Sequence, residues 1–127
     1  MEKLVPMAFA AEMKALKLNY AFMEWREKVI YPYFTGEYYE NDFTFEDNST
    51  GGEILVEGWT RGTWGELLDI CEKIKQRFAN YSTVIDNTAI SITYLNSAPM
   101  RTGDIELKKI QIRLATKAWK GSIENGT

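Results

Sequence analysis

The chain has 127 residues, of which 45% are hydrophobic and 26% are charged, and its formal net charge is −3 at pH 7. This length predicts one domain spanning residues 1–127, and the composition is that of an ordered globular protein rather than a disordered one. The net acidic charge argues against broad electrostatic binding to nucleic acid, which requires clustered lysine and arginine.

The first predicted element is a helix from Met7 to about Val29. Pro6 suits its first turn. A helix with so broad an apolar face must bury much of itself, either under a sheet or against another copy of the chain. Pro32 ends the helix because it disfavours helical geometry at Tyr31. The apolar residues that recur in steps of three and four are Ala8, Ala11, Ala15, Leu18, Phe22, Trp25 and Val29.

Two strands joined by a reversal follow. The first is predicted from Tyr33 to Phe45, where Phe43 and Phe45 alternate with polar residues. Asn41 to Gly52 is the least regular segment, and its glycines give the chain freedom to turn back. The second strand is predicted from Glu53 to Arg61.

Alternation along this second strand predicts two different faces. Ile54 and Val56 point to the core. Glu57, Trp59 and Arg61 point to a half-polar face that we expect to be partly covered. Trp59 is therefore a candidate interface anchor, and partial burial within the monomer is the alternative interpretation.

A helix from Trp64 to Phe78 is the best-marked local element. Thr63 and Glu66 have the spacing of a capping box, in which the Thr63 hydroxyl accepts the Glu66 N–H and the Glu66 carboxylate reaches back to the Thr63 N–H. The apolar stripe predicted to pack on the sheet comprises Trp64, Leu67, Leu68, Cys71, Ile74 and Phe78.

Two late strands complete the predicted fold, from Thr83 to Leu95 and from Asp104 to Trp119. In the second of these the apolar residues change phase, which predicts a β-bulge near Lys108-Lys109. A frayed tail is expected from about residue 121. The expected order is helix-strand-strand-helix-strand-strand, an α+β fold with a mostly antiparallel β-sheet flanked by two helices.

Catalytic and metal-binding patterns are not found in the sequence. It contains no histidine, which removes the commonest general base and zinc ligand. The single cysteine, Cys71, lies on an apolar helix stripe and is expected to be buried rather than reactive. The carboxylates Asp42, Glu46, Asp47 and Glu53 lack the pattern of a calcium loop and suit a solvated loop. We expect no enzyme activity, no catalytic residue, no cofactor and no metal.

The targeting signals are also weak. No apolar run is long enough to span a bilayer, and Glu12 and Lys14 interrupt the apolar N-terminal stretch before it could form a signal peptide. Synthesis in the cytoplasm is expected, with no membrane partner. Basic residues along the last strand suit a nucleic-acid surface, a solvent-facing row or the lumen of a ring. They are Lys108, Lys109, Arg113, Lys117 and Lys120.

From Ala8 to Gly121 the layout resembles the small tail terminator and tail-completion proteins of long-tailed bacteriophages, which include tail-to-head joining proteins. The resemblance rests on the Tyr31-Pro32-Tyr33 end of the first helix, a strand, a polar loop, the strand from Glu53 to Trp59, one amphipathic helix and two late strands. It implies an α+β fold and a structural role in virion assembly. No functional residue is carried over from the family.

The resemblance implies a homo-oligomeric ring, commonly a hexamer, that caps the tail tube and provides the surface for head docking. The implied partners are the tail tube protein and the head-tail connector protein, with DNA only passing through the lumen. The implied location is the tail or neck of the virion, made in the host bacterial cytoplasm. The candidate interface residues, chosen from the residues themselves, are Glu57, Trp59, Arg61, Phe43 and Phe45. Another ring-forming phage component, such as a tail tube or connector subunit, and a small non-viral module that binds a ligand or partner remain alternatives.

Overall fold

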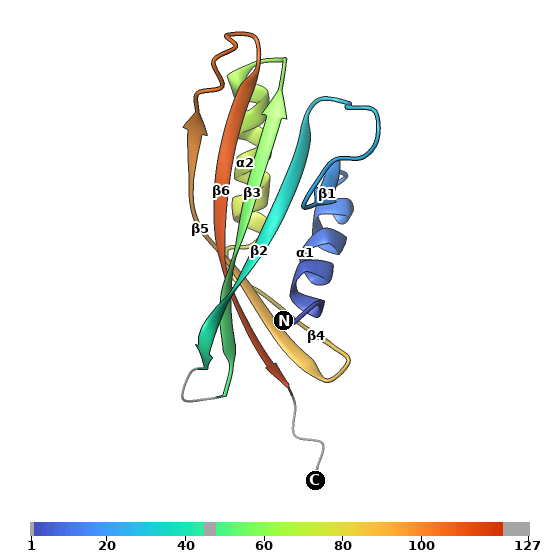
Figure 1. Cartoon of the computed structure of the whole chain (residues 1–127), viewed down its shortest axis with the longest axis vertical. Coiled ribbons are helices and arrows are strands. Elements are labelled where there is room, and N and C mark those ends of the chain that lie inside the picture. Colours follow the sequence, from blue (N-terminus) through green and yellow to red (C-terminus); the bar gives the residue numbers. More distant parts are fainter. Residues whose placement is uncertain (1, 45–47, 121–127) are drawn as a thin grey trace.

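The computed structural model describes residues 2–44 and 48–120, with two helices and six strands in this part of the chain (Figure 1). Three strands precede the second helix and three follow it, so the predicted order of helix-strand-strand-helix-strand-strand is wrong. The expected tail from about residue 121 and Phe45 lie outside the described residues. The elements are α1 (Leu4–Ala15), β1 (Tyr20–Phe22), β2 (Tyr33–Thr44), β3 (Thr50–Thr60), α2 (Trp64–Arg77), β4 (Tyr81–Ile85), β5 (Thr88–Met100) and β6 (Lys108–Lys120).

The strands form one mixed sheet in the order β1-β2-β3-β6-β5-β4. β1 pairs with β2 in parallel, and the other neighbours are antiparallel. The prediction of a mostly antiparallel β-sheet is therefore corrected to a mixed sheet. The physical cause is the route of the chain: residues 23–32 carry it back to the starting end of β1, so β2 runs in the same direction.

The parallel strand β1 was missed because the first helix is shorter than its apolar spacing indicates. The backbone of Lys17 is left-handed, with φ 61°. The Lys17 N–H donates to the Lys14 carbonyl (2.9 Å) and the Leu18 N–H donates to the Met13 carbonyl (3.1 Å). These are the two hydrogen bonds of a Schellman motif, which ends a helix. Phe22, predicted to be helical, lies in β1.

The strand predicted from Thr83 to Leu95 is a hairpin of two strands. Asp86 and Asn87 both have positive φ, 49° and 61°. This is the geometry of a two-residue turn whose twist matches the flanking strands. Val84 of β4 consequently lies opposite Ala89 of β5.

The predicted bulge near Lys108-Lys109 is also wrong. Ile105 lies in the turn before β6 and is 96% exposed, so the change of apolar phase marks the beginning of the strand. The sheet has its register shifts elsewhere, in β2 between Glu40 and Thr44 and in β5 between Tyr94 and Asn96.

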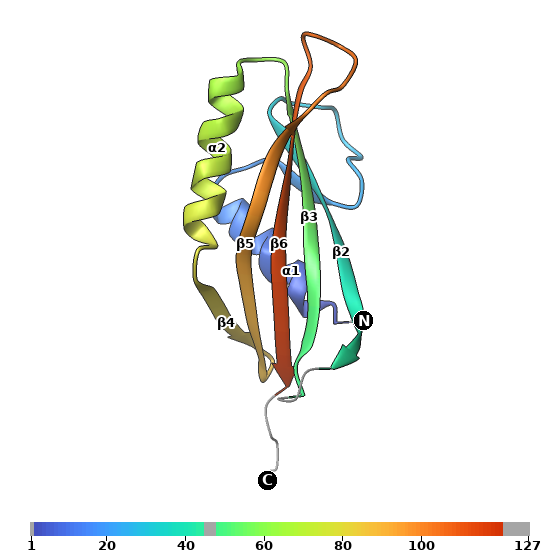
Figure 2. The ribbon, with the colours of Figure 1, turned by 90° about the vertical axis from the view of Figure 1, so that its left-hand side faces the viewer.

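Both helices pack on the same face of the sheet (Figures 1 and 2). Cross-strand pairs such as Ile54 with Leu114 and Val56 with Ile112 line this face and form one core with the helices. No helix among residues 2–44 and 48–120 covers the opposite face. That uncovered face bears the odd-numbered residues of β2, β3 and β6, which include Trp59.

The helix predicted from Trp64 to Phe78 is α2, with Phe78 as its C-cap. The Thr63 hydroxyl accepts the Glu66 N–H at 3.1 Å, as predicted. The other hydrogen bond of the expected capping box, from the Thr63 N–H to the Glu66 carboxylate, differs in the structure. The Glu66 carboxylate instead accepts a hydrogen bond from Thr60 Oγ1 at 2.7 Å. Cys71 is buried, as expected.

Thr63→Ala is expected to lower the free energy of unfolding by about 1 kcal/mol, because the Glu66 N–H loses its acceptor. Chemical denaturation measures this change. Thr63→Ser is the matched control: it retains a hydroxyl at the N-cap and should unfold close to the wild type. Equal stability of all three proteins would show that the cap contributes nothing.

Candidate interaction surface

Four aromatic side chains meet at one end of the uncovered sheet face. Tyr33 of β2 lies opposite Trp59 of β3, and their rings stack with centroids 4.9 Å apart and an interplanar angle of 19°. Trp25 and Tyr31, from the segment before β2, lie 5.3 and 5.6 Å from the Tyr33 ring. We call these four residues the Trp59 cluster.

Cations border the Trp59 cluster on two sides. Lys109 Nζ lies 5.5 Å from the Trp59 ring centroid and 2.9 Å from the Glu57 carboxylate. The Arg61 guanidinium lies 5.7 Å from the Tyr31 ring centroid. These positions are favourable because an aromatic face attracts a cation. Burial raises the pKa of Tyr33, with the neighbouring Tyr31 hydroxyl as the second cause. The cluster is therefore a partly desolvated aromatic surface with a charged rim.

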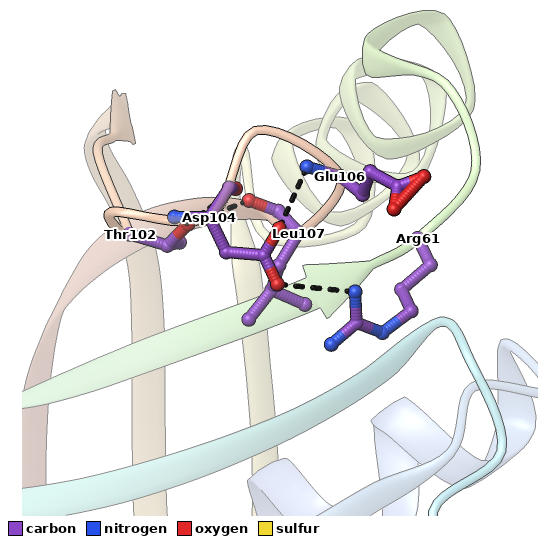
Figure 3. A network of polar contacts seen from close by, with 5 residues as sticks. All are labelled: Arg61, Thr102, Asp104, Glu106 and Leu107. Atoms are coloured by element: carbon purple, nitrogen blue, oxygen red, sulfur yellow. Dashed lines mark hydrogen bonds and ion pairs between the residues drawn. The ribbon is translucent and has the colours of Figure 1, made fainter.

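Arg61 connects this surface to the loop between β5 and β6 (Figure 3). Its guanidinium donates to Asp104 Oδ2 at 3.2 Å, and Asp104 Oδ1 accepts the Glu106 N–H at 2.9 Å. The Thr102 hydroxyl donates to the Leu107 carbonyl at 2.8 Å and closes the base of the loop. The Arg61 side chain is thus positioned by a hydrogen-bonded turn.

The pKa of Asp104 is lowered, first by the Glu106 N–H and then by Arg61. A lowered pKa means that the loop gains stability above the unfolded value of about 3.9 and loses it as the pH falls through the folded value. We expect Arg61→Gln to raise the Asp104 pKa only part of the way to its ordinary value, because the Glu106 N–H remains. NMR titration of the Asp104 carboxyl measures this pKa.

The control for this titration is Arg101→Gln, a change of an exposed arginine near the same loop that should leave the Asp104 pKa unchanged. A full return of the pKa to its ordinary value in Arg61→Gln would contradict the role given to the Glu106 N–H.

Basic residues of β6 pair with acidic residues of β3 on the uncovered face. Arg113 donates two hydrogen bonds to Glu53, at 2.8 and 2.9 Å, and this contact raises the pKa of Arg113. Lys109 forms an ion pair with Glu57, with Nζ 2.9 Å from the carboxylate. These pairs neutralise part of the basic row, which favours its interpretation as an ion-paired face over a nucleic-acid surface. Exposed pairs of this kind contribute about 0–1 kcal/mol each.

The structure brings three of the five candidate interface residues together. Glu57, Trp59 and Arg61 all lie at or beside the Trp59 cluster. Phe43 belongs to the opposite end of the β2–β3 pair, where Thr44 is paired with Thr50, and Phe45 lies outside the described residues. The cluster therefore excludes Phe43.

Sequence reasoning missed Trp25 and Lys109 as members of this surface. Trp25 was assigned to a helix that ends ten residues earlier, at Ala15. Lys109 reaches the site through the pairing of Trp59 with Lys109 across β3 and β6, and no local signal predicts that register. Tyr31 and Tyr33 could have been recognised from their position directly around Pro32.

A surface of mixed apolar and charged residues continues from the Trp59 cluster toward α1. A cavity of about 550 Å³ is lined by residues 20–27, which include Phe22 and Trp25 and the charged Glu24, Arg26 and Glu27. Phe22 also lines a second groove of about 260 Å³ with Pro6, Met7 and Ala10. The side chains of Met7 and Phe22 are 57% and 45% exposed. Apolar patches that continue over several elements are typical of interaction sites.

No protein-family model matches the chain, and a search of curated proteins finds no match. Among the described residues, no group of three or more Cys, Asp or Glu side chains could hold a metal ion. None of the described helices is long and apolar enough to cross a membrane. The functional proposal below therefore depends on the surface around Trp59.

Proposed function

We propose that this protein is a structural subunit of a bacteriophage tail, similar in role to tail terminator and tail-completion proteins. Copies of the chain form a ring that caps the tail tube and presents a surface to the head-tail connector. DNA passes through the ring lumen without being bound in a sequence-specific way. The role requires no cofactor and no catalytic step.

The observation that supports this proposal is the Trp59 cluster and its continuation to Met7 and Phe22. A ring subunit must offer large contact surfaces to its neighbours, and such surfaces are enriched in tryptophan, tyrosine, methionine and arginine. The cluster supplies two tryptophans and two tyrosines on the sheet face that no described helix covers, and Arg61 lies beside its Tyr31 ring. Trp59 is held between Tyr33 and Lys109, so a partner meets a pre-organised aromatic surface.

Solution mass over a concentration series, with negative-stain images of the same samples, tests the proposal. Rings of uniform size, commonly of six copies, are the expected result. The second arm of the experiment adds purified tube ends, because assembly on a template is compatible with the proposed role. A protein that stays monomeric with and without tube ends would contradict the proposed ring.

One observation favours a different function, a small ligand-binding module. The cavity of about 550 Å³ lined by residues 20–27 has a volume within the usual range of ligand sites, about 300–1,000 Å³. A ligand that occupies it would raise the melting temperature by an amount that grows with the logarithm of ligand concentration over Kd, with the protein remaining monomeric. A melting screen against a small-molecule library separates this candidate from the ring subunit.

A further inference from the structure

Another cavity lies where α2 begins and the loop between β5 and β6 turns, at the same end of the molecule (Figures 1 and 2). Its volume is about 410 Å³, which suits a small ligand or one large side chain of a partner. Its apolar wall is formed by Trp64, Met100, Ile105 and Leu107. The side chains of Trp64, Met100 and Ile105 are 39%, 37% and 96% exposed. Exposed apolar side chains that gather around one cavity are typical of a binding site.

The loop that carries Ile105 is held by its own hydrogen bonds. The Thr102 hydroxyl donates to the Leu107 carbonyl at 2.8 Å and accepts the Asp104 N–H at 3.1 Å. Asp104 Oδ1 accepts the Glu106 N–H at 2.9 Å. The Ile105 side chain takes no part in these bonds and is exposed to solvent. Because the loop is already ordered, a ligand that binds there does not have to order it.

Two cations line the cavity together with these apolar side chains. They are Arg101 and Lys108, and neither forms an ion pair with another residue in the described part of the chain. Lys108 is partly buried and lies two residues before the buried Ile110 of the same strand, so its side chain points to the sheet face that the helices cover. A partly buried ammonium group that lacks a carboxylate partner is stabilised by an anion that enters the cavity.

The acidic residue that lines the cavity, Asp104, is already engaged. Its carboxylate accepts a hydrogen bond from the Arg61 guanidinium at 3.2 Å and another from the Glu106 N–H (Figure 3). The pKa of Asp104 is lowered first by the Glu106 N–H and then by Arg61, with Lys108 as a smaller cause. Asp104 therefore leaves the charges of Lys108 and Arg101 largely unneutralised.

Glu66 and Glu106 lie nearby in the sequence, but neither lines the cavity. Glu66 follows Trp64 by two positions and so lies on another side of α2, where its carboxylate accepts a hydrogen bond from Thr60 Oγ1 at 2.7 Å. Glu106 is exposed. The lining thus carries two cations and one carboxylate that is paired elsewhere, and it suits an anion.

We propose that this cavity binds a carboxylate group attached to an aromatic or branched aliphatic body. The apolar body packs between Trp64 and Ile105. The carboxylate accepts hydrogen bonds from Arg101 and Lys108, and such charge-assisted bonds are stronger than those between neutral groups. The C-terminal residue of a polypeptide and a free small acid both offer this chemistry. The inference does not depend on the proposed ring, because Trp64 and Lys108 belong to the covered side of the sheet and the Trp59 cluster belongs to the uncovered side.

Titration of the full-length protein with 3-phenylpropionate, followed by NMR, tests the site. The matched probe is 3-phenylpropan-1-ol, which has the same apolar body and no charge. The acid should shift the backbone amide signals of residues 100–108 and the indole N–H signal of Trp64. It should bind at least about tenfold more tightly than the alcohol. Binding of both probes with equal affinity, or shifts confined to residues 20–27, would overturn the proposal.

A peptide arm separates the two sources of the carboxylate. An acetylated four-residue peptide that ends in leucine is titrated as the free acid and as the C-terminal amide. Binding of the peptide acid, but not of its amide or of phenylpropionate, would support the site and identify a polypeptide end as the source. Binding of phenylpropionate alone would support the site and identify a small acid. If neither acid binds, the proposal is wrong.

Lys108→Gln and Arg101→Gln should each weaken binding of the acid at least about fivefold and leave binding of the alcohol unchanged, because only the carboxylate loses a partner. Lys14→Gln is the matched control, because Lys14 is exposed in the last turn of α1 and does not line the cavity. Ile105→Ala should weaken the acid and the alcohol alike. The spectrum of each variant also reports whether it is folded. Folded Lys108→Gln and Arg101→Gln proteins that bind the acid as tightly as the wild type would contradict the assigned role of the two cations.

Discussion

Phe78→Ala is expected to lower the free energy of unfolding by about 3–5 kcal/mol, the usual cost of removing a buried phenylalanine. The Phe78 side chain is fully buried at the C-cap of α2. Its ring centroid lies 5.0 Å from that of Phe9 in α1 and 5.3 Å from that of Tyr81 in β4. Its carbonyl accepts the Tyr94 N–H of β5 at 2.9 Å. One ring thus joins both helices to the far edge of the sheet.

Denaturation in urea, followed by tryptophan fluorescence, measures this loss. Ile105→Ala is the matched control, because Ile105 is 96% exposed and its removal should change stability by less than about 0.5 kcal/mol. A loss of less than about 1 kcal/mol in Phe78→Ala would contradict a closely packed junction of α1, α2 and β4.

Trp59→Ala is expected to weaken assembly by about 2 kcal/mol or more, the threshold of an interface hot spot. The monomer should remain folded, because Trp59 projects from the uncovered face and is not a member of the core. Its stacking on Tyr33 at 4.9 Å contributes about 0.5–1.5 kcal/mol to the monomer. Assembly is measured by sedimentation over a concentration series, and folding is measured by thermal denaturation of the monomer.

Tyr39→Ala controls for the loss of an exposed aromatic residue from the same sheet face. Tyr39 is 53% exposed and pairs with Glu53, away from the cluster. It should affect assembly much less than Trp59→Ala. If Trp59→Ala unfolds, Trp59 is required for the stability of the monomer. If Trp59→Ala folds and assembles as the wild type does, the cluster is not part of the interface.

The elements that sequence reasoning predicted well depend on contacts between near neighbours. Helix α2 begins after Thr63, where a hydroxyl accepts a backbone N–H three residues ahead. The strand predicted from Tyr33 to Phe45 is observed as Tyr33–Thr44 within the described residues. Ile54 and Val56 are buried, as their alternation predicts. In each case the signal is complete within a few residues.

The errors arise where one pattern is compatible with two structures. Phe22 continues the spacing of α1, but the left-handed backbone of Lys17 ends the helix first. Asp86-Asn87 lies within a run that is otherwise typical of a single strand, and the turn splits that run. Trp64 and Leu68 have the spacing of buried residues, yet they lie to one side of the buried stripe of Leu67, Cys71 and Ile74 and remain exposed.

Local sequence was sufficient to place the α2 cap, the buried faces of the strands and the inward position of Cys71. It was insufficient for the Trp59 cluster, because Trp25, Tyr33 and Lys109 reach Trp59 through strand neighbours and register. Cross-strand register is set by the packing of the whole core, since a shift by one residue would turn every buried side chain to the outer face. The interaction surface is therefore a product of long-range pairing, whereas the elements that bear it are largely products of their own sequences.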